Sequence, residues 1–413
     1  MTAEGHEGNS RMVRLTRAQQ QERTRAAVLD AARDEFIERG YPAAKVDGIA
    51  ERAELTRGAV YSNFPSKRAL YLAVLIDMVE HDATSEQHAD ALPPPAAPSA
   101  SSASSASSVT DALGAFARTW LERMPLADGS PSLGRLHPGS PAGVLDDEPI
   151  RDAFGQLTRV EALLLALALE SYAPADAPSG RQVRRARLVL RLLDGPGASA
   201  NPALQFGDPF DIVLACAHLG GLDLADEWDP PHLPYVRPAR ACRDRWAPPP
   251  ELRDLLTHRP VGFTGDGVIT FLGTHRLEAA EEAVRAARTG DRITVAVTTA
   301  DPAETGRLVQ LRTGDFARCL RRVFEPGAWP RLSLVLDEGG LLASAAGVPA
   351  ADDDTEYAVR VRDGDIVARA GGRGAAHAAA TFGLPTAADS PAAPDGTPSP
   401  PSGRGHRTPG TTS

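Results

Sequence analysis

The sequence predicts a multidomain protein in which all-α N-terminal and middle regions are followed by an α/β domain. A chain of 413 residues is longer than one hydrophobic core usually serves. Apolar residues recur at three- and four-residue spacing up to about residue 220, which is typical of helices packed on a core. Beyond about residue 250, short apolar runs alternate with helical patterns, which indicates a sheet covered by helices.

Residues 1–22 are predicted to form a flexible basic arm, because they are polar and mostly without helix caps. A first helix is expected to begin at Thr24, whose hydroxyl can cap it. Its apolar residues form one buried stripe, which consists of Val28, Leu29, Ala32 and Phe36. Gly40, followed by Tyr41 and Pro42, is expected to end this helix.

Two shorter helices complete the layout of a helix-turn-helix DNA reader within residues 23–80. The second helix repeats the buried stripe between Val46 and Ala53. Thr56 stands where it can cap the third helix, and Val60 and Phe64 anchor that helix inward. The outward residues and their basic neighbours are the predicted DNA contacts, which are Lys45, Thr56, Arg57, Gly58, Ala59, Tyr61, Ser62, Asn63 and Lys67.

The charge distribution favours a nucleic-acid partner only at this end of the chain. The net charge is −10, yet residues 11–68 hold twelve basic and eight acidic residues, a balance that attracts phosphate. Among the 44 basic residues only Lys45 and Lys67 are lysine, and both lie in this segment. Lys67 falls in the first turn of a fourth helix capped by Ser66, where a cation opposes the helix dipole. We therefore expect an external anion beside it.

The run from Val46 to Leu75 resembles the TetR family of bacterial transcriptional regulators, most specifically in its Tyr-x-x-Phe-Pro-Ser-Lys motif from Tyr61 to Lys67. The resemblance implies a homodimer that presents two recognition helices to a near-palindromic operator in double-stranded DNA. It also implies a repressor that a small-molecule effector releases. By position, it implies phosphate contacts for Thr56, Tyr61 and Lys67, and base or backbone contacts for Arg57, Ala59 and Ser62 or Asn63.

Two positions depart from the family pattern. Glu54 stands where a turn glycine is common, and positive φ at a residue with a Cβ costs roughly 1 kcal/mol. The turn is therefore expected to be less tight than usual. Lys45 stands where a capping threonine is common, so the second helix is expected to lack a side-chain cap.

The middle of the chain, residues 109–255, is predicted to be a helical regulatory and dimerisation region after a Pro-, Ala- and Ser-rich linker at 81–108. The expected helices are Val109 to Arg123, Ile150 to Glu170, Arg181 to Leu193 and Pro209 to Leu219. The leucine stripe is interpreted as core or dimer interface rather than an effector cavity; it consists of Leu163, Leu164, Leu165, Leu167 and Leu169. The arginines between Arg181 and Arg187 are interpreted as a solvated helix face.

Residues 256–384 resemble a thioredoxin-like domain of the peroxiredoxin sort, and residues 385–413 are expected to be disordered. The expected elements are strands Val268 to Leu272, Ile293 to Thr298 and Leu332 to Leu336, helices His275 to Arg288, Ala303 to Phe324 and Ala375 to Phe382, and a hairpin of Tyr357 to Val361 with Ile366 to Ala370. In an active member a cysteine would stand within residues 272–276, where this sequence has none. The domain is therefore expected to be redox-inactive.

The three cysteines, Cys216, Cys242 and Cys319, lie far apart without a CxxC motif, so no metal site, disulfide framework, catalytic residue or cofactor is predicted. The most hydrophobic run, residues 160–169, is too short to cross a bilayer, and no secretory signal is recognisable. A cytoplasmic, nucleoid-associated bacterial protein without a membrane partner is expected. The alternative reading is a redox-linked sensor or enzyme whose C-terminal domain carries the activity.

Overall fold

The computed structural model describes residues 16–91, 108–123, 143–172, 180–198, 208–249, 252–325 and 332–383, without the side chains of 82–91 and 195–198. The described residues up to Phe382 pack as one unit. Most of the expected arm, residues 92–107 of the expected linker and the expected disordered tail lie outside the described residues. None of the described helices is long and apolar enough to cross a membrane.

The first helix, α1 (Arg17–Ala43), begins earlier than predicted. Thr16 caps it, because Thr16 Oγ1 accepts from the Gln19 amide at 3.3 Å while Gln19 Oε1 accepts from the Thr16 amide at 2.9 Å. The predicted cap at Thr24 is wrong, since that hydroxyl donates to the carbonyl of Gln20 at 2.9 Å inside the helix. The predicted flexible arm is likewise wrong from residue 17 onward, because these residues are helical.

Gly40 interrupts α1 as predicted, since its φ of 73° and ψ of 161° lie outside the helical region that a residue with a Cβ prefers. The next helices are α2 (Val46–Arg52), α3 (Arg57–Asn63) and α4 (Lys67–Ala91). Helix α4 runs through the expected linker boundary at residue 80. Buried side chains from all four helices share one core, among them Val28, Phe36, Ile49, Val60, Phe64 and Tyr71.

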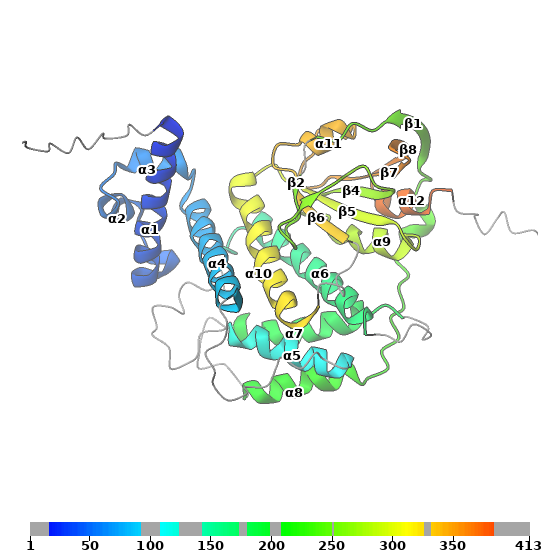
Figure 1. The fold of residues 1–413 in the computed structure, drawn as a ribbon, viewed down its shortest axis with the longest axis horizontal. Helices are drawn as coiled ribbons and strands as arrows, with labels where there is room; N and C mark the ends of the chain where they lie inside the picture. Colours follow the sequence, from blue (N-terminus) through cyan, green and yellow to red (C-terminus); the bar gives the residue numbers. More distant parts are fainter. Residues whose placement is uncertain are drawn as a thin grey trace, which may run out of the picture. The chain divides into compact units, whose positions relative to one another are not determined.

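Four further helices form the middle of the chain, close to the predicted positions (Figure 1). They are α5 (Val109–Glu122), α6 (Glu148–Glu170), α7 (Val183–Ala198) and α8 (Pro209–Gly220). The leucine stripe lies on α6, where Leu163, Leu164, Leu165 and Leu169 are buried within the chain's own core.

The predicted solvated arginine face around α7 is wrong for Arg185, which is buried, whereas Arg184 and Arg187 are exposed although they also bind neighbouring segments. Arg185 is only 9% exposed and donates to the carbonyl of Leu219 at 2.9 Å. Arg187 pairs with Glu281 at 2.5 Å. The partners are distant in the sequence, so helical spacing alone gave no sign of them.

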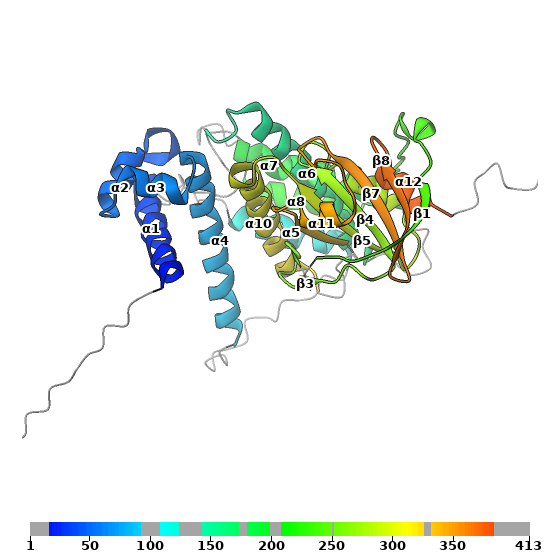
Figure 2. The ribbon, with the colours of Figure 1, turned by 90° about the horizontal axis from the view of Figure 1, so that it is seen from above.

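A six-stranded mixed sheet has the order β1-β8-β7-β4-β5-β6 (Figure 1), and Figure 2 shows its strands from above. Its parallel half is β4 (Gly267–Gly273), β5 (Arg292–Thr298) and β6 (Leu332–Leu336). Its antiparallel half is β7 (Glu356–Arg362), β8 (Asp365–Gly371) and the unpredicted β1 (Arg240–Arg245). The predicted hairpin turn is confirmed, since Asp363 and Gly364 have φ of 52° and 76°. A small second sheet pairs β2 (Leu252–Arg253) with β3 (Pro260–Val261).

Helices cover both faces of the large sheet. They are α9 (Ala279–Ala286), α10 (Arg307–Val323), α11 (Leu341–Ala345) and α12 (Ala375–Thr381), with a π-helical turn at Pro302–Gly306 before α10. Because side chains alternate along a strand, Ile269 and Phe271 pack with Leu342 of α11. Leu272 and Val295 belong to the core shared with α9 and α10.

Helix α10 belongs to the α/β region by sequence but packs among the preceding helices. The ring of Phe316 lies 5.8 Å from that of Phe116 and 6.0 Å from that of Trp120 on α5. Arg312 pairs with Glu161 of α6 at 2.7 Å, with both side chains buried. The expected boundary at residue 255 therefore does not separate two hydrophobic cores.

Candidate nucleic-acid interface

Helix α3 presents most of the residues predicted to contact DNA. Thr56 caps it as predicted, since Thr56 Oγ1 accepts from the amide of Ala59 at 3.2 Å. Val60 and Phe64 are buried and fix the helix against the core. Arg57, Gly58, Tyr61 and Ser62 are exposed, while Ala59 and Asn63 are half-buried.

The ion pair of Arg57 is exposed and weak, so its guanidinium can bind another group. Its side chain is 60% exposed and lies 3.3 Å from Asp47 Oδ1, which is 68% exposed. The guanidinium also lies over the ring of Tyr61, 5.4 Å from the centroid. The Tyr61 hydroxyl and then Asp47 raise the pKa of Arg57, so it stays charged. An exposed pair of this kind is weak and can be exchanged for a phosphate or a base edge.

The polar residues at the end of α3 use part of their hydrogen-bonding capacity inside the helix. Ser62 Oγ donates to the carbonyl of Ala59 at 2.8 Å, and Asn63 Nδ2 donates to the same carbonyl at 2.9 Å. Gly58 faces open space, since an added Cβ would meet only Thr56 Oγ1, at 3.9 Å. A glycine that packing does not require lets another surface approach the backbone closely.

Lys45 is exposed, and it provides no side-chain cap for α2, as predicted. Instead the buried carboxylate of Glu35 lies at this helix start, where Oε1 accepts from the Lys45 amide at 3.4 Å. Glu35 also pairs with Arg39 at 3.1 Å and with Arg52 at 3.2 Å. The Lys45 side chain remains available at the surface.

The Lys67 ammonium binds backbone carbonyls inside the protein, so the argument that its position requires an external anion is wrong. Its ammonium donates to the carbonyls of Tyr41 at 2.9 Å, Ala44 at 3.2 Å and Pro42 at 3.3 Å. It also lies 4.6 Å from the centroid of the Tyr41 ring, and burial lowers the pKa of Lys67. These carbonyls end α1, where a cation is favourable, so no external anion is needed to explain the lysine. A phosphate contact for Lys67 stays a prediction.

The turn between α2 and α3 is tight, so the expectation of a looser turn is wrong. Glu54 has a φ of 55°, the left-handed conformation that favours glycine. Its amide donates to the carbonyl of Glu51 at 3.1 Å, and the next amide, of Leu55, donates to Ala50 at 2.9 Å. The strain is held in place by the packing of the two helices.

The start of α1 adds residues that the sequence interpretation missed. Arg17, Gln20, Gln21 and Thr24 line a shallow open groove of about 490 Å³ together with Asn63. The spacing of Thr16 and Gln19 matches a capping box and could have placed this helix start correctly.

Comparison with known proteins gives matches at this end of the chain. Residues 28–74 match the family described as bacterial regulatory proteins, tetR family. The transcriptional activator FasR of Mycolicibacterium smegmatis is 46% identical over 68 residues, which are 16% of this chain and 29% of FasR. The uncharacterized regulator TtgW of Pseudomonas putida is 45% identical over 64 residues, 16% of this chain and 47% of TtgW. The regulator TtgR of Pseudomonas putida is 38% identical over 86 residues, 20% of this chain and 40% of TtgR.

The chain thus spans less than half the length of each of these relatives. A solved TetR transcriptional regulator from Rhodococcus sp. RHA1 aligns with a TM-score of 0.30 and 18% identity, over 50% of this chain and 99% of that one. The predicted TetR-type helix-turn-helix is confirmed for residues 28–74. The predicted thioredoxin-like resemblance of the C-terminal region is not confirmed; that region holds a mixed sheet with helices.

Proposed function

We propose that this protein is a DNA-binding transcriptional regulator in which α3 enters the major groove. The exposed, weakly paired Arg57 at the start of that helix carries the proposal, together with the family match over residues 28–74. The proposed DNA contacts are Lys45, Thr56, Arg57, Gly58, Ala59, Tyr61, Ser62, Asn63 and Lys67. Among them Lys67 has the fewest hydrogen-bond donors left for DNA, because three carbonyls already accept from its ammonium.

The proposal includes a homodimer that binds a near-palindromic operator. The exposed face of α8 supports it, where Phe210 is 80% and Leu214 55% exposed, and Leu188 and Leu192 are exposed on α7. Large apolar side chains exposed to solvent mark association surfaces. A two-fold axis through this face would give two readers per particle, which matches the symmetry of a palindromic site.

We further propose a cytoplasmic, nucleoid-associated repressor that a small molecule releases, with a non-catalytic α/β region of thioredoxin-like arrangement. The strand order β8-β7-β4-β5, with β4 and β5 parallel, supports this arrangement. Burial raises the pKa of Cys216 and of Cys319 to about 11. Thiols of that kind are protonated near neutral pH and poor nucleophiles, which favours regulation over redox chemistry.

The test is a selection of duplexes from a random-sequence library, followed by affinity measurement on the duplex recovered. Arg57→Ala should weaken binding about tenfold or more and relax the preference at one position, as expected when a base contact is lost. Arg243→Ala is the matched control, because Arg243 is also exposed and weakly paired, at 3.5 Å from Asp365, but lies on β1. If no sequence is enriched, or if both variants bind like the wild type, the proposal is wrong.

A further inference from the structure

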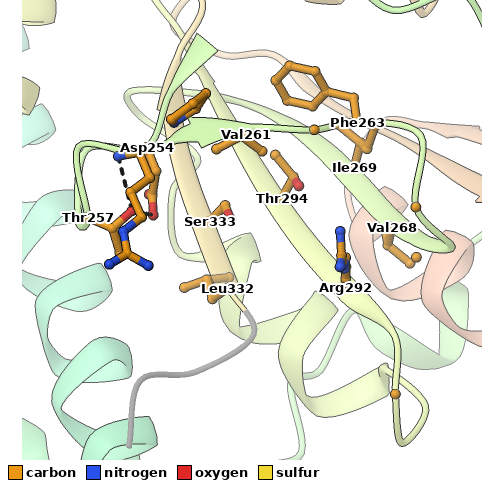
Figure 3. A pocket seen from close by; sticks show the side chains of 16 residues that line it. Asp254, Thr257, Val261, Phe263, Val268, Ile269, Arg292, Thr294, Leu332 and Ser333 are labelled. Carbon is orange, nitrogen blue, oxygen red and sulfur yellow. Dashed lines mark hydrogen bonds between the residues drawn. The ribbon is translucent and has the colours of Figure 1, made fainter. Parts of the chain in front are cut away.

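Two hollows have similar volumes, and among the described residues only one of them is lined by a buried side-chain group without a hydrogen-bond partner. The first, of about 670 Å³, lies at the amino ends of β4, β5 and β6, and its lining includes Asp254, Thr257 and Arg292 (Figure 3). Asp254 is fully used there, since it accepts from the Thr257 hydroxyl at 2.7 Å and from the Leu334 amide at 3.0 Å. Among the described residues, no buried polar atom in that lining lacks a partner.

The second hollow, of about 650 Å³, lies between α6, α7, α9 and the segment 228–232. Cavities of this size hold small organic molecules. Its lining includes Glu281 and Glu282 of α9, which are buried. It therefore joins helices of the middle region to the α/β region, and we refer to it as the α6–α9 cavity.

Glu282 is the unsatisfied group of the α6–α9 cavity. Its Oε1 lies 2.8 Å from Nε2 of His232, but its buried Oε2 has no hydrogen-bond partner among the described residues. The neighbouring Glu281, by contrast, pairs with both Arg187 at 2.5 Å and Arg285 at 2.8 Å. A buried carboxylate oxygen without a donor is costly, so this oxygen calls for an N–H or O–H group from outside the protein.

The lining also contains two arginines that no acidic side chain neutralises. Arg191 and Arg373 are exposed, and neither has an ion pair or hydrogen bond with any described residue. The other two arginines of the lining, Arg159 and Arg187, pair with Glu278 and Glu281. Positive charge is thus left over beside the opening, where it suits a carboxylate.

Aromatic side chains make up part of the wall between these polar groups. Phe154 of α6 and Trp228 both line the α6–α9 cavity. Each has an arginine over its ring: Arg312 lies 4.5 Å from the Phe154 centroid and Arg285 lies 5.2 Å from the Trp228 centroid. These cation–π contacts fix the two rings, so the part of each ring that lines the cavity is an ordered apolar surface.

We propose that the α6–α9 cavity binds a small aromatic acid that also carries a hydroxyl or amino group. The hydroxyl or amino group donates to Glu282 Oε2, the ring lies against Phe154 and Trp228, and the carboxylate binds Arg191 and Arg373. Each part of the ligand matches one feature of the lining.

Helix α6 connects this cavity to the DNA reader. Phe154 lies in the wall of the cavity, and Asp147, which precedes the same helix, pairs with Arg68 of α4 at 2.8 Å. Phe154 stands seven positions after Asp147, which corresponds to about 10 Å along a helix. A ligand that shifts α6 therefore acts on the first turn of α4, directly after α3. This regulatory role rests on the proposed function, whereas ligand binding itself does not.

The test measures binding by titration calorimetry on the full chain without DNA. The probes are 4-hydroxybenzoate, 4-hydroxyphenylacetate and 4-hydroxyphenylpropanoate, each compared with the acid that lacks the hydroxyl and with the neutral amide. At least one hydroxy acid should bind about tenfold tighter than both of its comparison compounds. Absence of binding by all three and by 4-aminobenzoate would overturn the proposal.

Two variants assign the contacts. Glu282→Leu should remove the preference for the hydroxyl because leucine has no acceptor, and Arg191→Gln with Arg373→Gln should remove the preference for the carboxylate, while Arg243→Gln changes neither. Circular dichroism confirms that each variant is folded, and equal binding by every variant would overturn the assignment. The bound acid is then added to the protein–duplex complex. Ligand binding without any DNA binding would defeat the proposed function but leave this inference intact.

Discussion

Two arginines show how differently one residue type is used in the two halves of this molecule. Arg57 at the start of α3 is 60% exposed and lies 3.3 Å from an equally exposed carboxylate. Arg312 on α10 is 3% exposed and lies 2.7 Å from the buried carboxylate of Glu161. The first pair contributes little to stability and can be exchanged for another anion. The second cannot be opened without leaving a buried charge.

The environment of an arginine, rather than its presence, therefore separates a candidate ligand contact from a structural one. Arginine makes up almost all of the 44 basic residues, so its frequency carries no functional information. The exposure of an arginine and the distance to its partner do indicate its role. The predictions below test whether stability and DNA binding divide between the two regions as this comparison requires.

The largest effect is expected from breaking the buried pair. Glu161→Ala or Arg312→Ala should each lower the free energy of unfolding by about 3–5 kcal/mol, because the remaining charge is buried without its partner. Urea denaturation measures the loss. The double variant Glu161→Leu with Arg312→Met should lose less than either single change, since Glu161 Oε1 and Arg312 Nε already lack partners. If Glu161→Ala or Arg312→Ala lowers the free energy of unfolding no more than Arg57→Ala does, the two arginines do not differ in their contribution to stability.

Lys67 combines internal hydrogen bonds, like the buried pair, with a predicted DNA contact, like Arg57. Lys67→Met should lower the free energy of unfolding by about 1–3 kcal/mol, because it removes the donor to three carbonyls but keeps an apolar stem. Thermal unfolding and the salt dependence of DNA binding are measured together. An unchanged stability, combined with a salt slope smaller by about one ion, would instead assign Lys67 to phosphate binding.

The smallest effect concerns the strained turn before α3. Glu54→Gly should raise the free energy of unfolding by roughly 1 kcal/mol, because glycine adopts the φ of 55° without a Cβ clash. Glu54→Ala is the control, since alanine keeps the Cβ and should bring no such gain. Equal stability of the glycine and alanine variants would show that the left-handed conformation is not a source of strain here.

Local signals in the sequence predicted several breaks, caps and turns correctly. The break at Gly40, the cap at Thr56 and the turn at Asp363 all follow from short-range chemistry and were predicted. The start of α1 was misplaced because a valid cap stands at Thr16 as well as at the plausible Thr24.

What could not be predicted depends on partners far apart in the chain. The carboxylate of Glu35 supports the start of α2, and the carbonyls at the end of α1 bind Lys67. Neither contact has a spacing that a sequence pattern can show. The carbonyls that bind Lys67 remove the reason to expect an external anion beside it. For the same reason the exposed face of α3 could be predicted from periodicity, but the strength of the Arg57 and Asp47 pair could not.

Helix α10 gives the chain an order of assembly. Its residues 307–323 leave the ribosome after the middle helices, yet they supply the phenylalanine that fills the space beside Trp120 and Phe116. At the start of α10, Arg307 donates to the carbonyl of Ala69 on α4 at 2.8 Å. During synthesis the aromatic side chains of α5 therefore stay uncovered until α10 has been made. Uncovered apolar surface of this kind favours aggregation and chaperone binding.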